Sequence, residues 1–198
     1  MRLRRSVVLA TAALVAALVV LAAAACGGGG PTTYTSKDFK FQLTYDSGVL
    51  SESASISAAG STGGTSAFNV GFVNPKGTKS GEEYRDGLVV SVYKLTQTVT
   101  DALLPAVKTE LESILPQLKQ SLGSGTTLSS LTQVDINGIK GFTADATYTM
   151  DKVPFKATVY FLINGDLEYQ VTAQAAESTW STMEPVFKSV MDSFKATQ

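Results

Sequence analysis

The side chains that most often carry out catalysis are scarce in this chain. It has no histidine, which is the most common general base and a frequent transition-metal ligand. Its single cysteine, Cys26, follows a run of alanines near the N-terminus. Serine and lysine are plentiful, but no motif among them indicates a nucleophile with its base. We therefore predict that the chain is not an enzyme and binds no cofactor.

Charged residues gather in one segment, which contains Glu82, Glu83, Arg85 and Asp86. Their carboxylates could bind calcium, but the spacing does not match an EF-hand, which needs oxygen ligands at fixed alternate positions and a final glutamate. We predict no metal site here. Arg85 is the only arginine after residue 25 and follows Tyr84, and both residue types are favoured at interfaces. These five residues are our candidate partner-binding patch, with an ordinary solvated loop as the alternative.

The first 25 residues have the pattern of a secretion signal. A basic head with Arg2, Arg4 and Arg5 precedes an apolar stretch and a run of small residues. The small residues before Cys26 resemble the lipobox of bacterial lipoproteins, although Ala23 stands where that motif more often has leucine. This resemblance implies that the Cys26 thiol is acylated with diacylglycerol, which carries fatty acids such as palmitate, and that cleavage makes Cys26 the new N-terminus.

An uncleaved membrane anchor is the alternative explanation of this segment. The apolar run is about 20 residues long, which is enough to cross a bilayer, but its many alanines make it a weak span. Both explanations place residues 27–198 outside the cytoplasm. We predict that the protein is held at the cell membrane by a lipid on Cys26.

The composition after the signal is that of one small, mildly acidic domain. We expect a signal at residues 1–25, a tether with Cys26 and a glycine-rich stretch at 26–33, and a single domain at 34–198. Without the three arginines of the signal, 13 basic and 17 acidic side chains remain, a net charge of −4. Such a chain does not attract nucleic acid through its overall charge, and it has no second cysteine for an internal disulfide.

Alternation of apolar and polar residues predicts a series of β-strands. Two Asn-Gly dipeptides favour tight turns. The one at 137–138 lies between the predicted strands 134–136 and 142–150, and the one at 164–165 lies between the predicted strands 155–163 and 167–175. Residues 88–95 are almost continuously apolar, which is typical of a strand covered on both faces. The predicted strands include residues 39–45, 68–72, 134–136, 142–150, 155–163 and 167–175, with a weak strand at 51–58 and a surface loop at 74–86.

Apolar spacings of three and four predict two main helices. The first covers residues 103–122 and is apolar on two sides; Pro116 lies about three turns in, so we expect a kink or break near Leu115. The second has an aromatic-rich stripe that begins at Trp180. Ser181 and Glu184 have the spacing of a capping box, so we expect regular helix from about Ser181. An antiparallel sheet packed with two main helices is an α+β fold.

This order of elements resembles the PsbP-like fold family, which includes the extrinsic PsbP subunit of photosystem II and actinobacterial envelope lipoproteins of the LpqN type. The resemblance rests on residues 37–43, on residues 134–142 with their Asn-Gly turn, and on residues 184–194. It implies a non-enzymatic accessory domain that docks on other proteins at a membrane surface.

Two functions are therefore expected. The first is a lipid-anchored binding domain that docks on envelope proteins and has a filled core. The second is a carrier that encloses a lipid or glycolipid in an apolar cavity between the sheet and the first helix. The carrier hypothesis predicts that Leu104, Leu111, Phe142 and Phe161 line this cavity.

Overall fold

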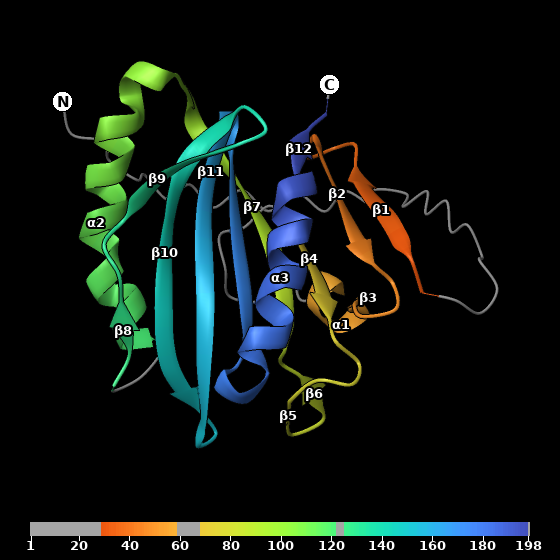
Figure 1. The fold of residues 1–198 in the computed structure, drawn as a ribbon. Coiled ribbons are helices and arrows are strands. Elements are labelled where there is room, and N and C mark those ends of the chain that lie inside the picture. The colour runs from red at the N-terminus through yellow and green to blue at the C-terminus, as the bar shows by residue number, and fades with distance from the viewer. Residues whose placement is uncertain (1–28, 59–67, 122–124, 198) are drawn as a thin grey trace.

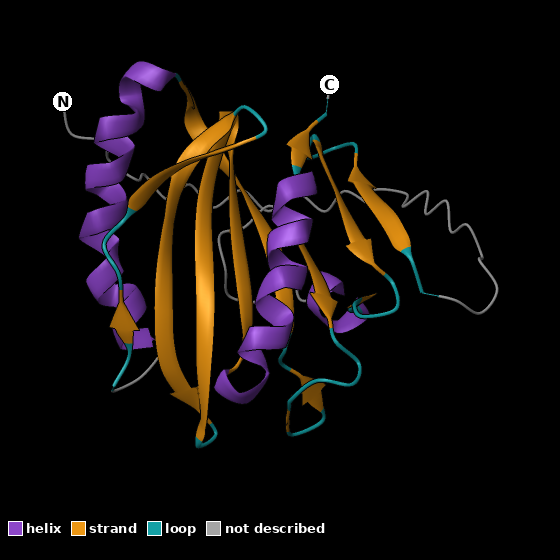
Figure 2. Ribbon diagram, in the orientation of Figure 1, coloured by secondary structure: helices purple, strands orange, loops and turns teal. Residues whose placement is uncertain are grey.

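The computed structural model describes residues 29–58, 68–121 and 125–197. The predicted signal and Cys26 lie outside these ranges. Figure 1 shows a twisted sheet with α2 at one side and α3 lying across it, and Figure 2 shows how strands dominate the domain. The main sheet has the strand order β3-β4-β7-β11-β10-β8, with β9 also paired to β10, and a small sheet has the order β1-β2-β12. All of these pairs are antiparallel.

The described elements are, in chain order, β1 (Pro31–Ser36), β2 (Phe41–Asp46), β3 (Ser51–Glu52), α1 (Ala54–Ala58), β4 (Phe68–Val73), β5 (Lys79–Ser80), β6 (Glu83–Tyr84), β7 (Gly87–Val99), η1 (Asp101–Leu103), α2 (Leu104–Ser121), β8 (Thr127–Leu128), β9 (Thr132–Ile136), β10 (Ile139–Met150), β11 (Val153–Ala176), α3 (Glu177–Ser193) and β12 (Lys195–Ala196). The predicted α+β class, with an antiparallel sheet and two main helices, is confirmed.

β11 reverses direction within its span. Its first arm pairs with β10 and its second arm pairs with β7. The reversal lies at Asn164 and Gly165, the predicted turn, where Gly165 has a φ of 66°. The Tyr148 hydroxyl on β10 donates a hydrogen bond to Gln174 near the end of the second arm, 2.6 Å away. The second arm therefore returns beside the first, which confirms the predicted meander.

The main sheet buries apolar side chains on both faces, because successive residues of a strand point to opposite sides. The larger core lies between the sheet, α3 and the small sheet, and a second cluster lies under α2. Buried strand residues of the larger core include Val90, Val92, Leu162, Val171 and Ala173, and those under α2 are Phe142, Ala144, Val159, Phe161 and Ile163.

Aromatic rings join the small sheet to the rest of the domain. Phe41 of β2 stacks on Phe194, just after α3, with 5.4 Å between the ring centroids. Tyr169 of β11 meets both rings edge-on, at 5.6 and 5.5 Å. The Tyr169 hydroxyl also lies 3.0 and 3.2 Å from the carbonyl oxygens of Phe39 and Lys40. These contacts fix the end of α3 against the opening strands.

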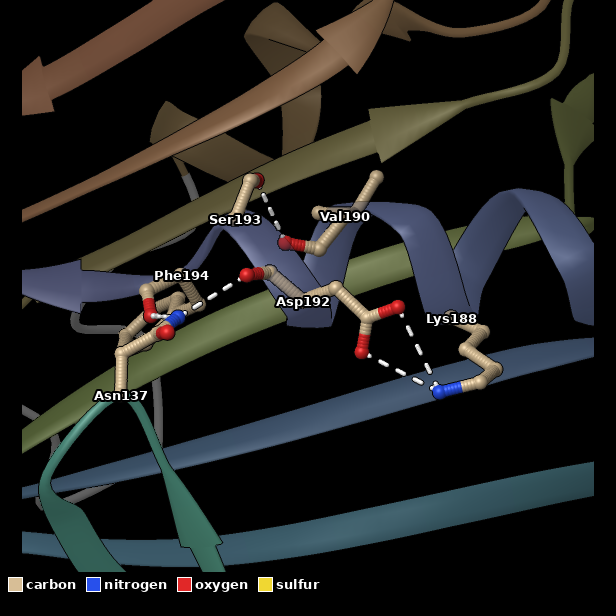
Figure 3. Close-up of polar contacts among 6 residues, drawn as sticks. All are labelled: Asn137, Lys188, Val190, Asp192, Ser193 and Phe194. Atoms are coloured by element: carbon tan, nitrogen blue, oxygen red, sulfur yellow. Dashed lines mark hydrogen bonds and ion pairs between the residues drawn. The ribbon is translucent and has the colours of Figure 1, made fainter.

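The turn between β9 and β10 also contacts the end of α3 (Figure 3). The side-chain amide of Asn137 donates hydrogen bonds to the carbonyls of Asp192 and Phe194, each at 2.9 Å. Those carbonyls are among the groups that a helix leaves unpaired at its C-terminus. Ser193 adds a hydrogen bond from its hydroxyl to the Val190 carbonyl, at 2.7 Å. The turn thus caps the helix from outside.

α3 begins earlier than the capping-box pattern predicted. It starts at Glu177 rather than near Ser181, and Pro185 lies well inside it. A proline leaves the carbonyl four residues earlier without its helical partner, but here that carbonyl belongs to the exposed Ser181, where water can bind it. The prediction that this helix starts near Ser181 was therefore wrong.

α2 continues through Pro116 to Ser121, so the helix does not break near Leu115, and the alternative of a kink there stays a prediction. Pro116 and Glu112, whose carbonyl loses its helical partner, are both exposed to solvent. Leu104 and Leu111 are the apolar residues of α2 that are buried, so the helix has one buried stripe rather than two covered sides.

The folded domain begins before the predicted boundary. Residues 31–33, expected in the tether, pair with β2. The Gly30 amide donates to the Ser47 hydroxyl at 3.2 Å, and the Ser47 amide donates to the Gly30 carbonyl at 2.9 Å. A β-carbon built on Gly29 would lie 2.1 Å from the Cα of Gly48, so these two backbones are in direct contact. Glycine at both positions allows this contact.

Three predicted segments differ in detail. The weak strand at residues 51–58 is a two-residue strand, β3, followed by α1, and the loop at residues 74–86 contains the short hairpin β5–β6. Buried and half-buried residues alternate along β7: Leu88 and Val90 are fully buried, whereas Ser91 is half-buried. The prediction that this strand is covered on both faces was therefore wrong. Among the described residues, no helix is both long enough and apolar enough to cross a membrane.

Candidate functional site

The predicted patch lies largely on the β5–β6 hairpin. Glu82 and Glu83 are exposed, and Glu83 forms an ion pair with Arg85 at 2.8 Å. The Lys79 ammonium lies over the Tyr84 ring, 4.6 Å from its centroid. These contacts are at the surface, where each contributes little to stability. Glu82, Glu83, Tyr84 and Arg85 form what we call the hairpin patch.

The patch prediction was wrong for Asp86, because this residue is fully buried and cannot contact a partner. Its carboxylate accepts hydrogen bonds from the Ala176 amide at 3.0 Å and from the Thr179 hydroxyl at 2.9 Å, at the start of α3. It also accepts from the amide and hydroxyl of Thr78, at 3.0 and 3.2 Å. Asp86 therefore ties the hairpin to α3, and a carboxylate at a helix N-terminus is electrostatically favourable.

Arg85 connects the hairpin patch to the end of the main sheet. Its carbonyl accepts a hydrogen bond from the Gln174 amide at 3.0 Å, and Gln174 in turn binds the Tyr148 hydroxyl. Burial raises the pKa of Tyr148 to about 12, although the Arg85 charge acts in the opposite direction. Tyr148 is therefore a neutral hydrogen-bond donor at physiological pH.

A groove of about 340 Å³ runs along α3. We call it the α3 groove. The helix lines one side, and residues of β9, β10 and both arms of β11 line the rest. The main lining side chains are Trp180, Glu184, Phe187, Lys188, Met191 and Asp192 of α3 with Thr143, Asp145, Thr158 and Tyr160 of the strands.

Carboxylates set the electrostatics of the α3 groove. Burial raises the pKa of Tyr160, and the charges of Asp145, Asp192 and Glu184 raise it further. Lys188 pairs with Asp192 at 3.2 Å, as Figure 3 shows, and the Thr158 hydroxyl donates to Asp145 at 2.8 Å. The groove is thus lined by aromatic side chains and carries more negative than positive charge.

A second groove, of about 380 Å³, lies on the other side of α3, against β2. Its lining residues include Pro31, Tyr45, Val49 and Val186. Because Pro31 opens β1, this β2 groove lies next to the point where the folded domain begins. Its side chains are mainly apolar and include no lysine or arginine.

The four residues predicted to line a lipid cavity do come together. Leu104, Leu111, Phe142 and Phe161 belong to one buried cluster under α2, each with at most 7% of its surface exposed. Neither groove described above includes any of them. The carrier hypothesis stays a prediction that would require this cluster to open.

Within the described residues, no group of three or more aspartate, glutamate, cysteine or histidine side chains is arranged to hold a metal ion. The α3 groove was not predicted as a site. A signal was present in the sequence, since Trp180, Glu184, Lys188 and Asp192 recur at intervals of four beside the apolar stripe. The strand residues that line the groove could not be predicted from the sequence, because their position depends on how the sheet packs against α3.

Comparisons with known proteins give structural matches only. No protein-family model and no curated protein matches the sequence. A cyanobacterial PsbP from Synechocystis superposes with a TM-score of 0.55 at 19% identity, covering 87% of this chain and 97% of that one. A crystal structure from Bacteroides thetaiotaomicron gives 0.53 at 10% identity, over 84% of this chain and 48% of that one.

LpqN of Mycobacterium tuberculosis, described as involved in cell envelope biogenesis, gives a TM-score of 0.49 at 12% identity, with 87% of both chains covered. The match to the cyanobacterial protein spans nearly all of the described domain. The chain therefore has the PsbP-like fold, as the sequence pattern predicted. At these identities the comparisons define the fold and leave the function to the site itself.

Proposed function

We propose that this protein is an extracytoplasmic, non-enzymatic domain, anchored to the membrane by a lipid on Cys26, that docks on other proteins of the cell envelope. The α3 groove carries this proposal. It combines Trp180 and Tyr160, which are only partly buried, with charged side chains that come from a helix and from paired strands. Partly exposed aromatic residues on rigid elements are typical anchors of protein interfaces.

The hairpin patch extends this docking surface. Asp86 joins the hairpin to Thr179, and the neighbouring residue Trp180 lines the α3 groove. Arg85 and Tyr84 are residue types enriched at interfaces. A partner seated in the groove could therefore reach the hairpin patch.

The contact between Gly29 and Gly48 limits how far the domain can lie from the membrane. Two residues lie between Cys26 and Gly29, so the three Cα-to-Cα steps that join them span at most about 11 Å when fully extended. If Cys26 carries the lipid, the start of β1 and the adjoining β2 groove lie near the membrane surface. Two or more acyl chains hold a protein firmly there, whereas one holds it only marginally.

The anchoring part is tested by the variant Cys26→Ser. Radiolabelled or alkyne-tagged fatty acid should label the wild-type chain and should not label the variant, which should also keep its N-terminal 25 residues. Acylation of the serine variant, or an unlabelled wild type, would contradict the proposed anchor.

The docking part is tested by photo-crosslinking in intact cells. A photoreactive amino acid replaces Tyr160 in the groove, Tyr84 in the hairpin patch, or Gln117 on the exposed side of α2 as the control. We expect one defined crosslinked protein from the Tyr160 position, a weaker product from Tyr84, and none from Gln117. Equal products from all three positions would contradict docking through the α3 groove.

A further inference from the structure

The charges that line the α3 groove are not balanced. Lys188 is the basic residue of the lining, and it already pairs with Asp192 on the same helix. Asp145 accepts a hydrogen bond from the neutral Thr158 hydroxyl. Glu184 is exposed and forms no hydrogen bond or ion pair with other described residues. The carboxylates of Asp145 and Glu184 therefore have no cationic partner in the part of the chain that the structure describes.

Aromatic side chains line the same groove as these two carboxylates. Trp180 packs against Phe187, with 6.1 Å between the ring centroids, which holds the indole at the groove. Tyr160 lies on the strand side, and its hydroxyl has no hydrogen bond among the described residues. An aromatic face attracts a cation through its quadrupole, and tryptophan is the strongest of the three aromatic residues in this respect.

We propose that the α3 groove binds a cationic segment of the partner protein, with an arginine or lysine side chain placed against Trp180 and between Asp145 and Glu184. This inference rests on the proposed docking function and names the class of partner. Arginine fits the arrangement better than lysine, because its planar group can stack on the indole and donate hydrogen bonds to a carboxylate at once. The site is selective by charge, since an acidic segment would meet two uncompensated carboxylates.

Trp180 provides a direct readout, because it is the only tryptophan in the chain. The mature full-length protein, kept in detergent, is titrated with an acetylated and amidated hexapeptide of alternating arginine and glycine while tryptophan emission is recorded. A glutamate–glycine hexapeptide serves as the charge control. We expect a saturable change with the arginine peptide only, and weaker binding as salt shortens the range of charge interactions.

The double variant Asp145→Asn with Glu184→Gln keeps Trp180 and both side-chain shapes. We expect it to bind the arginine peptide about tenfold more weakly, from the loss of two partly exposed charge pairs. Glu110→Gln on α2, on the other face of the sheet, makes a comparable charge change and should leave the affinity unchanged. A thermal melt of each variant shows that the fold is intact.

Three results would overturn the inference: no change in emission, an equal change with the glutamate peptide, or equal affinity in the double variant. The proposed function would still stand in each case if crosslinking from Tyr160 captured a partner. Conversely, peptide binding without any crosslinked protein in cells would support the cationic site and contradict docking in the envelope. The peptide titration and the crosslinking experiment can therefore contradict the two proposals independently.

Discussion

At the scale of single residues, the carboxylate of Asp86 joins segments that lie far apart in the sequence. Its partners are Thr78 in the loop before β5 and Ala176 and Thr179 around the start of α3. A buried carboxylate is tolerated only when hydrogen bonds replace its hydration, and here four donors do so. This residue explains why α3 begins without a capping side chain of its own.

Replacing Asp86 should therefore destabilise the domain strongly. We expect Asp86→Ala to lower the free energy of unfolding by about 3 to 5 kcal/mol, because it leaves buried amides without acceptors. The control Asp38→Ala, at an exposed position without side-chain hydrogen bonds, should cost less than about 0.5 kcal/mol. Urea denaturation measures both. Similar values for the two variants would show that Asp86 is not structural.

Tyr148 should make the domain sensitive to alkaline pH. Its pKa is about 12 in the folded state because of burial, against an ordinary value of 10.0. The folded state thus holds this proton more tightly, so the contribution is complete below pH 10 and is lost as the pH rises towards 12. This difference in pKa corresponds to roughly 2 to 3 kcal/mol in the free energy of unfolding.

The variant Tyr148→Phe tests this directly. It loses the hydrogen bond to Gln174, so we expect it to be about 1 kcal/mol less stable at neutral pH. Between pH 10 and pH 12 it should lose less stability than the wild type. Tyr34, whose burial also raises its pKa to about 12, should keep part of the slope. An unchanged pH dependence in urea melts would rule out Tyr148 as its source.

At the scale of elements, local patterns predicted most strands but were wrong about the start of α3 and about a break in α2. Alternation located β2, β4, β10 and the arms of β11, because each has one face that must be buried. The start of α3 was misplaced because its N-terminal groups bond to Asp86 from another segment. The continuity of α2 depends on Pro116 facing solvent, which the sequence pattern does not reveal.

Asn137 links two elements and has two separable roles. It has a φ of 51°, which suits the turn, and its amide binds two carbonyls at the end of α3. Asn137→Gly should keep the turn and lose the two hydrogen bonds, at a cost of about 1 to 3 kcal/mol. Asn137→Ala should cost more, since alanine also strains the turn. Equal stability of Asn137→Gly and the wild type would contradict the capping role.

Pro116 should be a weak point of α2. We expect Pro116→Ala to stabilise the domain by about 1 to 3 kcal/mol, because alanine restores the helical donor to the Glu112 carbonyl. Pro105 lies in the first turn, where proline is tolerated, so Pro105→Ala should change stability by less than about 0.5 kcal/mol. Thermal melts compare the two. A destabilised Pro116→Ala would indicate that the helix needs proline at this position.

At the scale of the whole molecule, the order of strands and helices was enough to predict the PsbP-like fold. The α3 groove was out of reach, because Asp145 and Tyr160 meet Trp180 only after β9, β10 and β11 have packed beside the helix. Of the five residues predicted for the patch, Glu82 and Glu83 are exposed and Tyr84 and Arg85 are half-buried, whereas Asp86 is buried. Burial of a charged residue depends on distant partners, which local composition cannot indicate.

We propose that the chain is a membrane-anchored docking domain rather than a lipid carrier. The most direct test is native mass spectrometry of the wild-type protein extracted from membranes in mild detergent, alongside Trp180→Ala. We predict a chain that begins at Cys26 with covalent acyl groups, accompanied by a protein partner that is missing from the variant. A stoichiometric, non-covalently bound lipid that both forms retain, with no protein partner, would contradict docking and favour the carrier.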